Sequence, residues 1–389
     1  MGVLTDRARN DPAGEYPHAS NAADSTPTAR IDSLMRAKLS AVMIVRNEAA
    51  NIARCLDSIR RGVDEIVVLD TGSTDATPDI ARKHGADVVV VEPEWSIELG
   101  GMRMLKDFGA ARNRALSLAS GTHAVIVDAD HAYVWPTLDA VREAAAQGQH
   151  DTWTLWYHMA AKPTARPVDV VTGRQRYAKP NGNIAMLRLV DGPWYDGVIH
   201  ETVAAWEERR HYSHGTTRGN VVKSRIADYG HEPTERARLG KDLRNILLLE
   251  RAAELDPTNP VPLTYLALEY ASRDVGRASA LCEQAWAFLG HPKLIGAQFL
   301  RLVVARCWAA LRRKDADTAW ATLSEWDARE GVEHPDVLTL RGLVAEALGM
   351  TDHAREMFRA ACTPSETQWT VRYISSDTAA ERLKALGAG

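Results

Sequence analysis

Short apolar runs alternate with helix-type segments in the first third of the chain, and this alternation constrains the fold more than any other feature. The runs are residues 39–45, 65–69, 88–91 and 124–127. Between them, apolar residues recur at helical spacing,. Continuous apolar strands separated by helices are typical of a parallel sheet that is covered on both faces. The sequence therefore predicts an α/β domain with a Rossmann-like, mostly parallel sheet.

Polar residues follow three of the predicted strands directly. They are residues 46–48, the turn at 70–75 and the pair Asp128 and Asp130. Ligands of parallel α/β sheets bind outside the carboxyl ends of the strands, so we expect these segments to share one rim. Neighbouring carboxylates repel each other unless a cation bridges them, and Mg²⁺ and Mn²⁺ prefer oxygen ligands. The sequence therefore predicts a site for Mg²⁺ or Mn²⁺ at this rim.

Composition divides the chain into three parts. Residues 1–37 lack apolar periodicity, and we expect a disordered leader there,. Residues 38–232 hold the α/β pattern and, after it, strand-type segments such as 153–157 and 195–203,. Residues 233–389 have a helical pattern to the end. We therefore predict an α/β domain followed by an all-α domain.

The helical part contains a degenerate repeat. Ala278, Ala319 and Ala354 stand at similar turn-then-helix positions, 41 and 35 residues apart. The tetratricopeptide repeat, which is a pair of helices, has a period of about 34 residues. Stacked helix pairs form an α-solenoid with an extended surface for partners. We therefore predict a tetratricopeptide-like solenoid that serves packing and partner binding, including pairing of two copies of the chain as a homodimer.

Bulk composition argues against several classes of function. The 389 residues carry 25% charged side chains and a formal net charge of −4, so no general basic field is available for nucleic acid,. No segment approaches the roughly 18 apolar residues of a membrane-spanning helix. The four cysteines have no metal-ligand spacing, which fits a reducing compartment,. We expect a cytoplasmic protein without a transmembrane segment and without a nucleic-acid partner.

Five short motifs follow one another in this chain, at residues 43–48, 70–75, 111–113, 128–130 and 199–201. In this order they resemble the family 2 glycosyltransferases of the GT-A fold, and the helical part resembles the repeat domain that some members carry. The resemblance implies an enzyme that moves a sugar from a nucleotide-diphosphate sugar, most often a UDP-sugar, and inverts the anomeric centre. It also implies an acceptor, for which the repeats favour a peptide or a protein.

The resemblance further implies roles for the residues of these motifs. Contacts to the donor nucleotide fall on Val45, Arg46, Asn47, Glu48, Asp70, Gly72, Ser73, Arg112, Asn113 and Asp128. The metal falls on Asp128 and Asp130, with His200 as the third ligand or a phosphate partner. The cation would neutralise charge that develops on the leaving diphosphate. Glu201 is the candidate general base that removes the acceptor proton.

Several alternatives stay open at the level of sequence. His231 rivals His200 as a metal ligand, and His131 stands where many relatives have an acid, so it would be a ligand or touch the acceptor. Residues 95–107 suggest a long loop that could close as a lid. A sugar nucleotidyltransferase would need a glycine-rich loop after the first strand, which residues 46–50 lack. A non-enzymatic scaffold would have no need of the acidic motifs, which are intact.

Overall fold

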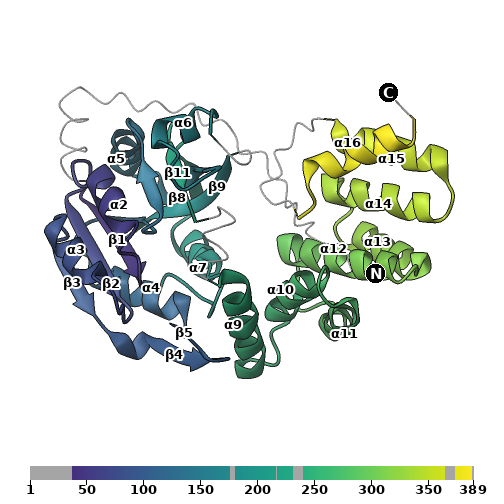
Figure 1. Ribbon diagram of the computed structural model, residues 1–389, viewed down its shortest axis with the longest axis horizontal. Coiled ribbons are helices and arrows are strands. Elements are labelled where there is room, and N and C mark those ends of the chain that lie inside the picture. Colours follow the sequence, from purple (N-terminus) through teal and green to yellow (C-terminus); the bar gives the residue numbers. More distant parts are fainter. Residues whose placement is uncertain (1–36, 176–179, 216, 231–239, 364–372, 388–389) are drawn as a thin grey trace, which may run out of the picture.

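Figure 1 shows a computed structural model in which an α/β lobe is followed by a helical region. The structure describes residues 37–175, 180–215, 217–230, 240–363 and 373–387. Except for Ala37, the predicted leader lies outside these ranges, and so does His231.

Within the described residues, nine strands form one mixed sheet in the order β3-β2-β1-β6-β9-β8-β11-β7, and β10 pairs with β8. The first four are parallel neighbours: β1 (Leu39–Val45), β2 (Glu65–Asp70), β3 (Val88–Val91) and β6 (His123–Ile126). The others are β7 (His131–Tyr133), β8 (His150–Met159), β9 (Asn181–Arg188), β10 (Thr217–Asn220) and β11 (Ile226–Asp228). Strand β9 is antiparallel to both β6 and β8. The predicted α/β fold is confirmed, with its parallel half formed by the strands that the apolar runs predict.

Helices cover both faces of this sheet, as continuous apolar strands require. They are α2 (Ile52–Ile59), α3 (Thr77–Lys83), α4 (Phe108–Ser117), α5 (Thr137–Gln147), α6 (Pro167–Val171) and α7 (Ala204–His214), with a 3₁₀ turn η1 (Pro93–Trp95). Alternate residues of β1 point to opposite faces, so that Met43 packs in the core with α2 and Val42 packs in the core with α4,. Helix α2 buries its whole apolar face, which comprises Ile52, Cys55, Leu56 and Ile59.

The predicted long loop at residues 95–107 contains a β-hairpin instead. Strands β4 (Ser96–Leu99) and β5 (Met102–Leu105) pair antiparallel. The turn between them is Gly100-Gly101, with φ of 55° and 75°, a left-handed conformation that glycine adopts without steric cost,. A Cβ added to Gly100 would lie 2.9 Å from Leu247 of helix α9 (Lys241–Leu255). The hairpin tip is therefore packed on the helical region.

The helical region consists of antiparallel hairpins after α9, as predicted from the repeat. Its other helices are α10 (Val261–Tyr270), α11 (Val275–Trp286), α12 (Gly296–Arg312), α13 (Ala316–Arg329), α14 (Pro335–Ala347), α15 (Thr351–Cys362) and α16 (Ser376–Ala385). Ala278, Ala319 and Ala354 are each the fourth residue of the second helix in a hairpin, and each is fully buried. A side chain this small lets paired helices approach closely, which explains its recurrence. Among the described helices, none combines the length and the apolar character needed to cross a membrane.

Candidate functional site

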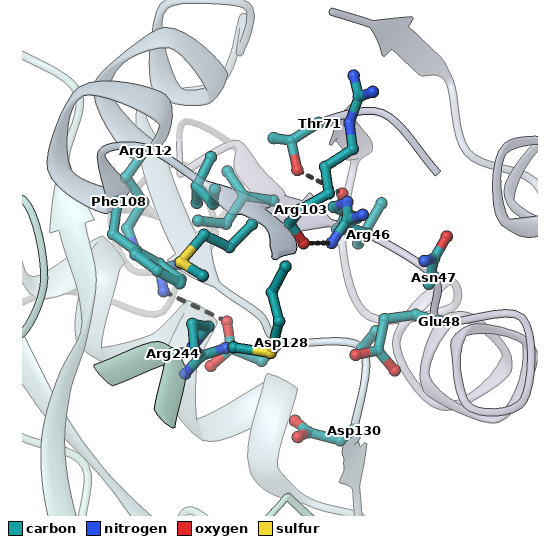
Figure 2. Close-up of a pocket in the computed structure, with 16 residues that line it drawn as sticks. Arg46, Asn47, Glu48, Thr71, Arg103, Phe108, Arg112, Asp128, Asp130 and Arg244 are labelled. Carbon is teal, nitrogen blue, oxygen red and sulfur yellow. Dashed lines mark hydrogen bonds and ion pairs between the residues drawn. The ribbon is translucent and has the colours of Figure 1, made fainter. Parts of the chain in front are cut away.

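A pocket of about 440 Å³ opens at the carboxyl ends of β1 and β6. Figure 2 shows that its walls come from the segments after these strands, from the β5 side of the hairpin, from α4 and from α9. Residues 46–48, Thr71, Asp128 and Asp130 all line it. The prediction that the strand-end segments meet at one rim is therefore confirmed.

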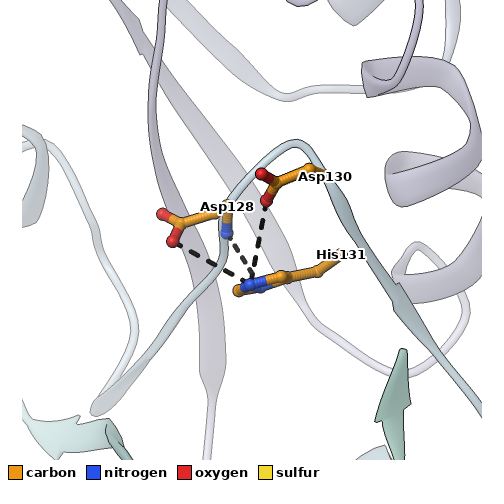
Figure 3. A group of neighbouring side chains, drawn as sticks. All are labelled: Asp128, Asp130 and His131. Carbon is orange, nitrogen blue, oxygen red and sulfur yellow. Dashed lines mark hydrogen bonds and ion pairs between the residues drawn. The ribbon is translucent and has the colours of Figure 1, made fainter. Parts of the chain in front are cut away.

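Asp128, Asp130 and His131 form a group whose ligand atoms all lie within 4.8 Å of one another (Figure 3). The Nε2 atom of His131 is 3.9 Å from Asp128 Oδ2 and 3.8 Å from Asp130 Oδ1. The His131 N–H donates to the Asp128 carbonyl at 3.0 Å and closes a tight turn. This turn brings the three side chains together. The two carboxylates are the oxygen ligands that suit Mn²⁺ or Mg²⁺.

The His131 ring is oriented by the backbone of the same turn. The Asp128 N–H donates to His131 Nδ1 at 3.2 Å. A ring nitrogen that accepts this bond has no proton, so a neutral ring has its proton on Nε2, which faces both carboxylates. His131 therefore belongs to the acidic group, where the sequence left its role open.

Arg112 of α4 connects this group to Glu201. Its Nε donates to Glu201 Oε1 at 2.8 Å, and its Nη2 lies 3.4 Å from Asp128 Oδ1. Burial disfavours the guanidinium charge, but the carboxylates of Asp128 and Glu201 outweigh this effect and raise the pKa of Arg112. For Asp128, burial opposes ionisation, yet Arg112 and His131 hold the pKa of its carboxyl below the usual range. The side chains thus form one network of alternating charge along the pocket wall.

The segment that contains Glu201 is docked on the first turn of α4. The N–H groups of Phe108 and Gly109 donate to the carbonyls of Val198 and Gly197 at 2.8 and 3.1 Å. A Cβ on Gly109 would lie 2.7 Å from the Gly197 carbonyl oxygen, so only glycine permits this approach,. Glu201 itself faces Arg112 with 13% of its side chain exposed, and it lies outside the lining of the pocket.

Asn113 fixes a neighbouring stretch of chain. Its Oδ1 accepts from the N–H groups of Trp194 and Tyr195 at 3.0 and 2.8 Å, and its Nδ2 donates to the Tyr195 carbonyl at 2.8 Å. Its amide is therefore occupied in holding the backbone. The structure does not bring Asn113 into the pocket, where the resemblance places a nucleotide contact.

Asp70 builds the turn after β2 from inside the protein. Its Oδ1 accepts from the N–H groups of Gly72 and Ser73 at 2.9 and 2.7 Å, and the residue is fully buried. Its Oδ2 is also buried and has no hydrogen-bond partner among the described residues. The turn presents Thr71 to the pocket and keeps Asp70, Gly72 and Ser73 behind it.

The segment after β1 is tied to the same turn and to the hairpin. The Asn47 N–H donates to Ser73 Oγ at 2.8 Å, and Asn47 Oδ1 accepts from the Thr74 N–H at 2.8 Å. Arg46 Nη1 donates to the Arg103 carbonyl at 2.5 Å. Val45 and residues 46–48 line the pocket together. Hydrogen bonds therefore fix the side of the pocket where the nucleotide is predicted to bind.

His200 is not brought to the acidic group. Its φ is 55°, and its ring stacks on Tyr265 of α10, with ring centroids 4.0 Å apart and planes at 6°. Contact with the helical region and the charges of Arg301 and Arg244 lower the pKa of His200. Among the described residues, the histidine that lies beside Asp128 and Asp130 is His131, whereas the resemblance suggested His200.

Arg244 is a pocket residue that sequence reasoning missed. It comes from the first turn of α9 and lines the pocket with its guanidinium carbon 5.3 Å from the centre of the Phe108 ring (Figure 2). Its Nε and Nη2 donate to Asn245 Oδ1 at 3.3 and 3.0 Å. Its position depends on the tertiary contact between Arg244 and Phe108, which no local pattern encodes. The helical region therefore contributes a cation to the pocket.

Comparison with known proteins identifies one family in the α/β lobe. Residues 40–157 match the model of Glycosyl transferase family 2. This span includes the first four motifs and excludes His200 and Glu201. A TPR repeat-containing protein of Synechococcus elongatus is 40% identical over 119 residues, which are 31% of this chain and 27% of that protein.

Other similar proteins cover more of the chain. The SPbeta prophage-derived glycosyltransferase SunS of Bacillus subtilis is 27% identical over 227 residues, which are 58% of this chain and 48% of that protein. The chain thus spans less than half the length of these two curated relatives. Glucosyl-3-phosphoglycerate synthase from Mycobacterium tuberculosis, solved with Mn²⁺, UDP and glucosyl-3-phosphoglycerate, is 20% identical with a TM-score of 0.35, covering 59% of this chain and 84% of that chain.

Proposed function

Residues 40–157 form a family 2 glycosyltransferase domain, and on this premise we propose that the protein transfers a sugar from a nucleotide-diphosphate sugar, preferably a UDP-sugar, to an acceptor. The observation that supports this most is the meeting of Asp128 and Asp130 with residues 46–48 in one pocket. Acidic ligands beside a polar wall suit a nucleoside diphosphate bound through a divalent cation.

We assign the cation, Mn²⁺ or Mg²⁺, to Asp128 and Asp130, with the Nε2–H of His131 facing the two carboxylates beside it. When bound, it would supply positive charge where the departing diphosphate becomes negative. Arg112 lies in the same wall, and its guanidinium is always charged, so it adds to this field,. Val45, Arg46, Asn47 and Glu48 are our candidates for the nucleoside side, with the Asp70 turn behind them.

Glu201 stays our candidate for the group that accepts the acceptor proton. A general base must come within hydrogen-bond reach of that proton in the complex with the acceptor. Arg112 lines the pocket, and its Nε donates to Glu201 Oε1 at 2.8 Å from behind the pocket wall. This hydrogen bond fixes the Glu201 carboxylate. Its second carboxylate oxygen would be the one to act.

The other functions are less well supported. A nucleotidyltransferase would need a phosphate-binding glycine loop, whereas here the chain after β1 is Arg46-Asn47-Glu48. A scaffold that had lost activity would not need a buried arginine between two carboxylates. We propose that the catalytic domain spans residues 38–232 and the repeat domain residues 233–389. A peptide or protein acceptor, a homodimer formed through the repeats and a cytoplasmic location stay predictions.

A panel of nucleotide sugars measured by thermal shift, with and without Mn²⁺, tests the proposed function. A ligand that binds only the folded state at one hundred times its Kd adds about 2.7 kcal/mol of stability. We expect a UDP-sugar to raise Tm in the presence of Mn²⁺ and much less after EDTA treatment. If no nucleotide sugar changes Tm under either condition, the proposed donor class is wrong.

We expect the Arg244 guanidinium to contact the substrate in the pocket that it lines. Replacing Arg244 by alanine should then lower kcat/KM about tenfold or more, because a hydrogen bond to a charged group contributes about 1.5–3 kcal/mol. Arg244→Lys should recover part of the loss, since it keeps the charge. Arg329→Ala is the matched control: Arg329 also lies near a phenylalanine ring, 5.9 Å from Phe299, inside the helical region. Steady-state kinetics that show equal effects of Arg244→Ala and Arg329→Ala would contradict a substrate contact.

A further inference from the structure

The helical region reaches the active site through an aromatic contact as well as through Arg244. We propose that Tyr265 of α10, held in place by Arg301 of α12, is a positioning residue for Glu201 and, through Glu201, for Arg112. This inference rests on the proposed function for what the positioned groups do. It assigns the repeats a part in catalysis, where the sequence predicted only packing and partner binding.

Tyr265 lies between two side chains. The ring of His200 stacks on it with centroids 4.0 Å apart, and the guanidinium carbon of Arg301 lies 3.3 Å from its centroid. Two groups so close to one ring must occupy opposite faces. Arg301 is buried, and its Nη1 donates to Thr264 Oγ1 at 3.3 Å. Tyr265 is therefore a fixed platform rather than a mobile surface ring.

The chain around His200 is shaped to reach this platform. Ile199 packs beside Ile246, Leu249 and Leu266, which belong to α9 and α10. His200 has a left-handed backbone, with φ of 55°, which is unfavourable for a residue with a Cβ,. Such a conformation persists where surrounding contacts determine it. Here the contacts of Ile199 and His200 with the helical region hold the backbone in this conformation.

Glu201 and Arg112 connect His200 to the acidic group. Glu201 is the next residue, and its Oε1 accepts from Arg112 Nε at 2.8 Å. Arg112 Nη2 lies 3.4 Å from Asp128 Oδ1. Backbone hydrogen bonds hold the segment on both sides of His200: α4 binds Gly197 and Val198, and Asp196 and Thr202 pair with each other at 2.9 Å. Between these points, the stacking of His200 on Tyr265 sets the path of the chain that leads to the Glu201 carboxylate.

The test uses the full-length chain with Tyr265→Ala, Tyr265→Phe and a control, Trp286→Ala. Trp286 packs against Phe299 and lies under the guanidinium of Arg306, at 4.1 Å, so its removal also breaks an aromatic–arginine contact inside the helical region. We expect Tyr265→Ala to lower kcat at least about tenfold, since small displacements of catalytic groups are costly. Affinity for UDP with Mn²⁺ should stay within about threefold, because the contacts that hold Arg46 and Asn47 do not involve Glu201,.

Tyr265→Phe keeps the ring and should restore kcat to within about threefold of wild type, and Trp286→Ala should leave kcat in the same range. Wild-type kcat in Tyr265→Ala, or an equal loss in Trp286→Ala, would overturn the proposal. Hydrogen exchange separates it from the proposed function, because it needs no reaction. Amides of residues 196–203 should exchange at least about tenfold faster in Tyr265→Ala than in Trp286→Ala. Equal exchange in the two variants would also overturn it.

Discussion

Replacing Asp130 by asparagine is expected to reduce sugar transfer by about 10²–10³-fold, the scale of losing one preorganised electrostatic contact in an active site. Asp130 and Asp128 are the two carboxylates of the acidic group, and an amide is a much weaker ligand for a hard cation,. The remaining activity should need a higher Mn²⁺ concentration for half-saturation. Initial rates measured across a Mn²⁺ titration report both effects.

Asp139→Asn provides the control for this change, since Asp139 is an exposed acid on α5. It should leave the rate and the Mn²⁺ response unaltered. Turnover by Asp130→Asn at the wild-type rate, with the same dependence on Mn²⁺, would remove Asp130 from the metal site.

Glu201→Gln is expected to reduce transfer by about 10²–10⁴-fold, the usual contribution of a general base. Glutamine keeps an oxygen that can accept from Arg112 Nε, so the network along the pocket wall should stay in place,. The variant should therefore bind UDP with Mn²⁺ as wild type does, and its Tm should change little. Calorimetric titration and single-turnover kinetics on the same sample separate binding from chemistry.

An unchanged rate of transfer would also define the role of Glu201. If Glu201→Gln transfers sugar at the wild-type rate while binding the donor normally, Glu201 is not the base. Its carboxylate would then serve to hold Arg112, and the base would have to come from elsewhere in the pocket or from the acceptor.

Local patterns in the sequence were sufficient for the parallel half of the sheet and its rim. The apolar run at 39–45 coincides with β1, because a strand buried on both faces has to be apolar throughout,. The run at 88–91 coincides with β3, the partly buried edge strand of the sheet. The convergence of residues 46–48 with Asp128 and Asp130 followed from topology alone, since parallel strands end at the same edge. The alanine positions of the repeat were found in the same way, from the period of a simple helix pair.

The remaining parts of the site depend on packing between distant segments. Residues 195–203 have a strand-like composition, yet they form a loop with a single bridge between Asp196 and Thr202. Gly197 at φ 108° and His200 at φ 55° interrupt the extended backbone. The side-chain amide of Asn113 and the surface of α10 decide this path, and neither contact leaves a periodic signal in the sequence.

The conformation of residues 95–107 and the surroundings of His200 also depend on packing between distant segments. The segment at 95–107 appeared to be a loop because its strands are short and end at Gly100-Gly101, but pairing between β4 and β5 and contact with Leu247 make it a hairpin wall. His200 and His131 are both histidines beside an acid. Only the tertiary structure shows that one stacks on Tyr265 and the other faces Asp128.

A crystal structure of the protein with Mn²⁺ and UDP, using anomalous scattering from manganese, tests the central claim most directly. We predict one anomalous peak within coordinating distance, about 2–2.5 Å, of carboxylate oxygens from Asp128 or Asp130, with the diphosphate completing the coordination. The uracil and ribose should lie against residues 45–48. A peak bound elsewhere, or UDP bound in this pocket without a metal near Asp128 and Asp130, would contradict the account.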